Sequence, residues 1–118
     1  MARPAHVRDA VAALLGERHA WTVDSAHAEL TARGVPADRA SVHRAFTSLC
    51  ARGETQRFEV SGRTYFERTG EHHEHAVCER CGAIEAVEGC VVVEHAIPGF
   101  AVTGHSVTFS GVCGACSR

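Results

Sequence analysis

Two Cys-x-x-Cys pairs constrain this chain more than any other feature of its 118 residues. The first pair is Cys78 and Cys81, the second is Cys113 and Cys116, and the 31 residues 82–112 lie between them. Each pair lets one short turn present two thiolates to the same ion, so two pairs supply the four ligands of a tetrahedral Zn²⁺ site. One pair alone is also typical of a redox dithiol, but two pairs of matched spacing favour a structural zinc.

The distribution of charge divides the chain into two parts. Residues 1–68 hold ten Arg and eight acidic side chains, whereas residues 69–118 hold two Arg and six Glu. All the cysteines except Cys50 lie in the second part. A segment as short as the second part rarely buries enough apolar surface to fold unaided, so a metal that contributes folding energy meets a physical need. We therefore predict two domains with these bounds.

Apolar residues at helical spacing predict three helices in the first part. Their expected bounds are residues 7–15, then Thr22 or Asp24 to Leu30, then Asp38 or Ser41 to Gly53. The alternative starts are all residues that cap helices well, and glycine favours the end of the third helix. The apolar stripe of the third helix consists of Val42, Ala45, Phe46 and Leu49.

A β-hairpin is expected directly after these helices. Ser61-Gly62 is a two-residue turn signal, and the flanking residues 55–60 and 63–68 have the composition of strands. Three helices followed by a hairpin describe a winged helix-turn-helix, whose third helix enters the major groove of DNA.

Short strands punctuated by glycine are expected in the second part. They are predicted at residues 76–77, 83–87 and 106–109, while residues 90–97 fit either a strand or a short helix. The fold class expected for the chain is therefore α+β, with an N-terminal winged helix-turn-helix and a small α/β zinc-containing domain after it. Cys50 is expected in the core of the first domain, and Cys90 is expected to be a free thiol.

A dense run of candidate metal ligands, His72-His73-Glu74-His75, precedes the first cysteine pair. Side chains alternate between the two faces of a strand, so His72 and Glu74 point one way while His73 and His75 point the other. One short segment can therefore contribute to two different metal sites. A closed thiolate site combined with an exchangeable site of imidazoles and carboxylates is typical of a metal sensor.

Three stretches of the chain combine into one recognisable pattern. They are the segment from His72 to Gly82, the segment from Ser41 to Phe46, and Gly104-His105-Ser106 followed by Gly111-Val112-Cys113. These stretches resemble the metal-binding signature, the recognition helix and the C-terminal strand of the ferric uptake regulator family of metal-dependent transcriptional repressors. The resemblance implies a homodimer that binds operator DNA through its winged helix. It also implies a structural zinc, a regulatory metal, and dimerisation through the second domain.

The resemblance further implies which residues hold the regulatory metal. One set is His72, Glu74, Glu94 and His105, which would form a site within the second domain. A second set joins Glu67, His73 and His75 to a residue of the DNA-binding domain, for which His19 is the available candidate. Imidazole with carboxylate suits Fe²⁺, Zn²⁺, Mn²⁺ or Ni²⁺. The Glu within the histidine run resembles the iron-responsive pattern, so iron is the expected signal, with zinc-uptake and peroxide-sensing regulation as alternatives.

The expected DNA contacts lie on the third helix and on the hairpin. They are Ser41, His43, Arg44, Arg57 and Arg63. Arg44 is the best candidate for a base or phosphate contact, and His43 stands where the family commonly has Tyr. The formal net charge of the whole chain is −2, whereas phosphate contacts supply much of the affinity for DNA, so binding requires local clustering of Arg.

Other functional classes fit the sequence less well. His72-x-Glu74 before a cysteine pair also occurs in zinc deaminases, but there a Pro precedes the pair and here none does, so no catalytic site is expected. A zinc-ribbon interaction module without a regulatory metal is the alternative from another class, and zinc stoichiometry separates the two. No apolar run approaches about 18 residues and no signal-peptide core is present, so we expect a cytoplasmic protein without membrane contact.

Overall fold

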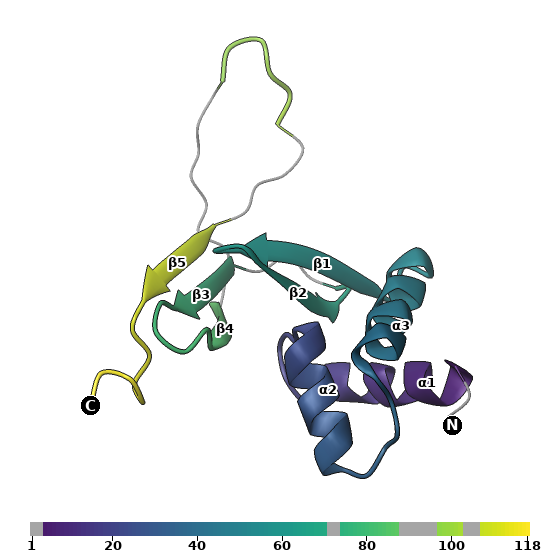
Figure 1. The fold of residues 1–118 in the computed structure, drawn as a ribbon. Helices are drawn as coiled ribbons and strands as arrows, with labels where there is room; N and C mark the ends of the chain where they lie inside the picture. The colour runs from purple at the N-terminus through teal and green to yellow at the C-terminus, as the bar shows by residue number, and fades with distance from the viewer. Residues whose placement is uncertain (1–3, 71–73, 88–96, 103–106) are drawn as a thin grey trace. The chain divides into compact units, whose positions relative to one another are not determined.

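The chain divides into two compact units, Met1–Gly70 and Glu71–Arg118. The computed structural model describes residues 4–70, 74–87, 97–102 and 107–118. Within these ranges the first unit contains helices and a β-hairpin, and the second contains short strands (Figure 1).

The helices of the first unit are α1 (Pro4–Leu15), α2 (Val23–Ala32) and α3 (Arg39–Ala51). Thr22 caps α2: its hydroxyl accepts a hydrogen bond from the Ser25 amide at 3.0 Å, and the Ser25 hydroxyl accepts one from the Thr22 amide at 2.9 Å. Asp38 caps α3, because its carboxylate accepts a hydrogen bond from the Ser41 amide at 2.7 Å. Of the alternative starts, the structure therefore has Thr22 and Asp38. The first helix begins three residues earlier than predicted, since proline suits a first turn.

The hairpin has the predicted bounds. β1 (Thr55–Val60) and β2 (Arg63–Arg68) pair antiparallel, with Val60 opposite Arg63. Ser61 and Gly62 connect them with φ of 52° and 78°. Two successive residues at positive φ give the turn a twist that matches the strands, and glycine adopts this conformation without strain. The three helices and the hairpin confirm the winged helix-turn-helix of an α+β fold.

One apolar core holds the first unit together. It consists of Val7, Val11, Leu14, Leu15, Trp21, Ala26, Leu30, Val42, Ala45, Phe46, Leu49 and Phe66. Phe46 of α3 stacks on Phe66 of β2 with ring centroids 4.2 Å apart. The backbones of Trp21 and Phe66 exchange two hydrogen bonds of 2.9 and 2.7 Å, while the Trp21 indole donates to the Leu14 carbonyl at 2.8 Å. These contacts hold α3 and the hairpin together through a shared core.

The second unit contains a three-stranded sheet of order β4-β3-β5. β3 (Glu74–Cys78) pairs antiparallel with β4 (Ile84–Val87) and parallel with β5 (Thr108–Gly111). β3 is longer than the strand predicted at residues 76–77, and β5 begins and ends two residues later than predicted, because pairing with a distant strand sets these ends. Of the ambiguous stretch 90–97, all but Ile97 lies outside the described residues. No helix in the described ranges is long and apolar enough to cross a membrane.

Candidate metal centre and nucleic-acid interface

Two turns of the second unit present the cysteine pairs. β3 ends at Cys78, and the turn that follows is closed by the Gly82 amide donating to the Cys78 carbonyl at 3.0 Å. Gly82 has φ of 76°, which favours glycine at this turn. The second turn follows β5, where the Ser117 amide donates to the Cys113 carbonyl at 2.9 Å. Because β3 and β5 are parallel, with Cys78 opposite Gly111, the turns that follow these two strands lie at the same end of the sheet.

The four cysteine sulfurs form a compact cluster. The Sγ atoms of Cys78, Cys81, Cys113 and Cys116 all lie within 4.8 Å of one another. The sulfurs of Cys81 and Cys113 are 3.7 Å apart. A tetrahedral ion with Zn–S bonds of about 2.3 Å places its sulfurs about 3.8 Å apart. The residues therefore fit a Zn²⁺ ion in ligand type, ligand number and spacing, as the sequence predicted.

Hydrogen bonding within this cluster sets the thiol pKa values in opposite directions. The Cys113 amide donates to the Cys78 sulfur at 3.3 Å, and this bond, together with other backbone amides, lowers the pKa of Cys78 to about 6. The pKa of Cys116 is raised to about 12, chiefly by its hydrogen bond with Cys113, since the thiol proton is shared with neighbouring sulfurs. The lowered pKa of Cys78 favours the thiolate, which is the form that binds metal.

The remaining cysteines are separate from this cluster. Cys50 of α3 is partly buried against the core of the first unit, as expected, and burial raises the pKa of its thiol. Cys90 lies outside the described residues.

Of the first predicted regulatory set, only Glu74 lies within the described residues. It begins β3, and its carboxylate accepts a hydrogen bond from the Val107 amide at 2.5 Å. His72, Glu94 and His105 lie outside the described residues. The structure therefore shows the position of Glu74 alone, and the four-residue ligand set stays a prediction from the sequence.

The described residues of the second predicted ligand set belong to both units: His19 and Glu67 to the first, and His75 to the second. In the first unit, His19 Nε2 lies 3.1 Å from a carboxylate oxygen of buried Glu67, and the Gln56 amide donates to the other oxygen at 2.7 Å. In the second unit, His75 pairs with Thr108 across β3 and β5. His73 lies outside the described residues. The sequence analysis missed Gln56, because only the hairpin register, which sets it opposite Glu67, indicates its position.

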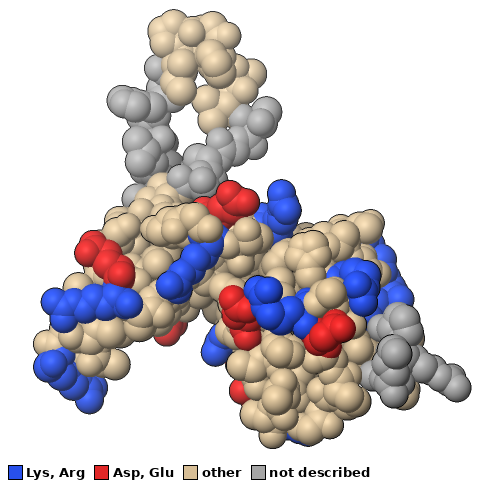
Figure 2. Space-filling model, in the orientation of Figure 1, with Lys and Arg blue, Asp and Glu red and all other residues tan. Residues whose placement is uncertain are grey.

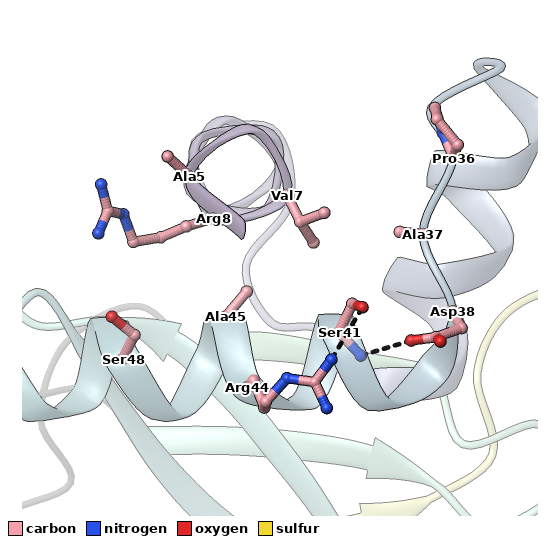
Figure 3. Close-up of a pocket in the computed structure, with 10 residues that line it drawn as sticks. All are labelled: Ala5, Val7, Arg8, Pro36, Ala37, Asp38, Ser41, Arg44, Ala45 and Ser48. Carbon is pink, nitrogen blue, oxygen red and sulfur yellow. Dashed lines mark hydrogen bonds between the residues drawn. The ribbon is translucent and has the colours of Figure 1, made fainter. Parts of the chain in front are cut away.

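One face of α3 is open to solvent. Its exposed residues recur at helical spacing: Arg39, Ala40, His43, Arg44, Thr47 and Ala51. The Arg44 guanidinium donates to the Ser41 hydroxyl at 3.1 Å, which holds the charged end of this side chain against α3 (Figure 3). The opposite face of α3 packs into the core through Val42, Ala45, Phe46 and Leu49. A helix that is buried on one side and polar on the other suits insertion into a groove.

The hairpin extends this polar surface. Arg57 of β1 and Arg63 of β2 line a cavity of about 570 Å³ together with His43 of α3. Arg39 of α3 lines the same cavity and pairs with Asp24 at 2.5 Å. Figure 2 shows basic and acidic side chains interspersed over the surface, so the local arrangement of charge matters more than the net charge.

Comparisons with known proteins agree with this architecture. Residues 2–109 match the model of the ferric uptake regulator family. The ferric uptake regulation protein of Neisseria gonorrhoeae is 30% identical over 115 residues, which cover 86% of this chain and 78% of that protein. The crystal structure of the Vibrio cholerae ferric uptake regulator aligns with a TM-score of 0.74 at 22% identity, covering 96% of this chain and 91% of that one.

A second similar structure is that of FurB from Mycobacterium tuberculosis, described as a zinc uptake regulator. It aligns with a TM-score of 0.54 at 25% identity and covers 97% of this chain and 95% of its own. A winged helix-turn-helix joined to a small unit with a four-cysteine cluster defines a class of metal-binding regulators. The chain belongs to the ferric uptake regulator family, as its motifs predicted.

Proposed function

We propose that the protein is a metal-responsive transcriptional repressor, not an enzyme, that binds double-stranded operator DNA as a homodimer when a regulatory divalent metal is bound. The observation that carries the proposal is the exposed polar face of α3, with His43 and Arg44 on it, in a chain that also holds four clustered cysteine sulfurs. The free thiols of the described cysteines suit a reducing compartment, so we place its action in the cytoplasm.

Arg44 is the proposed reader of base edges. A guanidinium can donate two parallel hydrogen bonds to guanine in the major groove, and such a pair is worth about 1–3 kcal/mol of discrimination. Ser41 and His43 lie beside Arg44 on α3 and complete the proposed contact surface. Arg57 and Arg63 belong to the hairpin, where their charges suit contacts with the phosphate backbone.

The four-cysteine cluster is the proposed structural zinc site. Its ion would join the turn after β3 to the turn after β5, so its role is to stabilise the second unit. The second unit is in turn the proposed dimerisation domain, and the first unit the DNA-binding domain.

The regulatory metal is proposed to bind the imidazoles and carboxylates of the histidine run and its partners. The first set is His72, Glu74, Glu94 and His105, and the second, less well supported, is Glu67, His73, His75 and His19. The bound metal would couple its own site to the DNA-binding surface, and a typical coupling free energy of about 1–3 kcal/mol changes DNA affinity roughly 5- to 150-fold. Iron is favoured by the Glu within the run. Zinc is the second candidate, because one similar structure is that of a zinc uptake regulator.

The test is DNA binding in the presence of each metal. Purified protein is stripped of exchangeable metal, analysed for retained zinc, and titrated onto genomic DNA fragments with Fe²⁺, Zn²⁺, Mn²⁺ or Ni²⁺. We expect one tightly held zinc per chain, and at least a fivefold gain in affinity with one added ion. DNA affinity that is the same with every ion and with chelator would overturn the regulatory proposal.

A single variant tests the reading helix. Arg44→Ala should weaken binding to the selected fragment by more than about 1 kcal/mol while leaving the metal content unchanged. Arg33→Ala is the matched control, because Arg33 pairs with Glu17 and Glu29 away from the exposed face of α3. If Arg44→Ala and Arg33→Ala bind alike, α3 is not the reader.

A further inference from the structure

Two cavities of the first unit border α3 along different sides. One, of about 570 Å³, is lined by residues of the hairpin together with Arg39 and His43. The other, of about 590 Å³, is lined by residues of α1 together with Ser41 and Arg44. Figure 3 shows the second cavity, with Arg8 extending from α1 and with Ser41, Arg44 and Ser48 along α3. We name them the wing-side cavity and the α1-side cavity.

Both cavities carry an excess of positive charge. The wing-side cavity has three guanidinium groups, those of Arg39, Arg57 and Arg63, against the single carboxylate of Asp24. The α1-side cavity has the guanidinium groups of Arg8 and Arg44 against the single carboxylate of Asp38. Asp24 is paired with Arg39, and Arg8 lies 3.9 Å from the carboxylate of exposed Asp9. Asp38 caps α3, and the nearby Arg44 guanidinium helps to lower the pKa of its carboxyl group. The excess of positive charge is therefore larger in the wing-side cavity, where Asp24 is the single lining carboxylate against three guanidinium groups.

The geometry of DNA explains why two such cavities belong to one helix. The major groove is about 12 Å wide and admits one α-helix, so a helix lying in it has a phosphate backbone on either side. In helix-turn-helix proteins the helices outside the groove contact these backbones and set the register of the reading helix. Basic cavities on both sides of α3 are complementary to that arrangement.

We propose that each cavity receives the phosphate backbone of one DNA strand, with Arg8 of α1 as a contact on one strand and Arg39 as a contact on the other. This inference rests on the proposed DNA-binding function and extends it to two residues that no resemblance assigned. Arg8 is half-buried and lines the α1-side cavity, and its guanidinium lies 3.9 Å from the carboxylate of exposed Asp9. The N-terminus of α2 also opens onto the wing-side cavity through Thr22 and Val23, and helix N-termini favour anions.

The pairing of Asp24 with Arg39 allows the wing-side cavity to be tested with a single substitution. The carboxylate both repels phosphate and competes for the guanidinium. Asp24→Asn removes the negative charge while keeping the size of the side chain, so Arg39 becomes fully available to DNA. The inference therefore predicts changes of opposite sign for variants on the two sides: weaker binding for Arg8→Gln and tighter binding for Asp24→Asn.

The experiment measures the salt dependence of binding to a fluorescein-labelled, random-sequence duplex of about three helical turns. Each phosphate contact contributes about 0.9 to the slope of log affinity against log salt concentration, measured between about 50 and 200 mM. Arg8→Gln should lower the slope by about this amount, which corresponds to a roughly fivefold loss of affinity at 0.15 M salt. Arg33→Gln removes the same charge from the same unit and should leave the slope unchanged.

The outcomes separate this inference from the function on which it rests. If the wild-type protein binds neither genomic nor random duplexes with any metal, the DNA-binding function itself is wrong. If the wild type binds but Arg8→Gln and Arg33→Gln have equal slopes, the α1-side cavity is not a phosphate site. If Asp24→Asn fails to tighten binding, Arg39 is not a contact. A loss for Arg8→Gln that varies with DNA sequence would make Arg8 a base reader and overturn its assignment to phosphate.

Discussion

Loss of one zinc ligand is expected to unfold the second unit and spare the first. The two units differ greatly in apolar burial. The first has a core of twelve residues, whereas Val77 and Cys78 are the buried apolar residues among those described in the second. Burying two side chains of this size stabilises by about 3–6 kcal/mol. A structural zinc contributes about 10–16 kcal/mol, which exceeds the apolar burial of the described residues of the second unit.

Cys113→Ser removes a ligand sulfur, which lies 3.7 Å from the Cys81 sulfur, and keeps the backbone amide that donates to Cys78. We expect zinc retained after dialysis against a chelator to fall from about one ion per chain to less than about a tenth. Hydrogen exchange locates the damage, because the Glu79 amide donates to the Gly111 carbonyl at 2.7 Å and should lose its protection. The Phe66 amide, which donates to Trp21 in the first unit, should remain protected.

Cys50→Ser is the matched control. Cys50 packs against the core of the first unit and is not part of the four-cysteine cluster, so this variant should retain its zinc. Burying a serine hydroxyl in its place should cost the first unit about 1–3 kcal/mol. Full zinc content and unchanged Glu79 protection in Cys113→Ser would refute the reasoning, because three cysteines would then suffice for the site.

Three further outcomes are expected. Thr22→Ala removes the hydroxyl that accepts a hydrogen bond from the Ser25 amide and should lower the free energy of unfolding of the first unit by about 0.5–2 kcal/mol. Each kcal/mol should lower the Tm measured by thermal unfolding by roughly 4–8 °C. The Ser41 amide lowers the pKa of Asp38 in the folded protein. The stability from this cap is therefore present above the ordinary carboxyl pKa and is lost as pH falls through the lower folded value. Asp38→Asn should make the free energy of unfolding depend less on pH below about pH 4. His105→Ala should keep the tight zinc but abolish the metal-dependent gain in DNA affinity, and an unchanged metal titration would exclude His105 as a regulatory ligand.

The first unit was predictable where local chemistry decides the structure. The hairpin followed from Ser61-Gly62, because only certain residue pairs tolerate two positive φ values in succession. The helix starts were narrowed to short alternatives, and the choice of Thr22 over Asp24 depended on the reciprocal bond with Ser25. No local pattern indicated that Trp21 would pair with the distant β2 strand.

A candidate site could be predicted from the sequence when its residues are spaced in a regular motif. The cysteine cluster was identified completely, because its ligand spacing is itself the signal. The contact between His19 and Glu67 was anticipated only through family resemblance, since these residues are far apart in sequence and meet through tertiary packing. Arg8 was not singled out at all, because an Arg on a helix gives no sign of the cavity that it lines.

The parallel pairing of β3 and β5 has a consequence for how length can vary in this family. The proposed zinc ion would join the ends of the two strands, so the 31 residues between Cys81 and Cys113, which include β4 and β5, would be a segment closed at both ends. The entropic cost of closing a flexible loop rises by only about 0.6 kcal/mol for each doubling of its length. Inserting one residue inside either cysteine pair would instead displace a sulfur from the ion. Insertions and deletions should therefore accumulate between the two pairs over evolution, while the spacing within each pair stays constant.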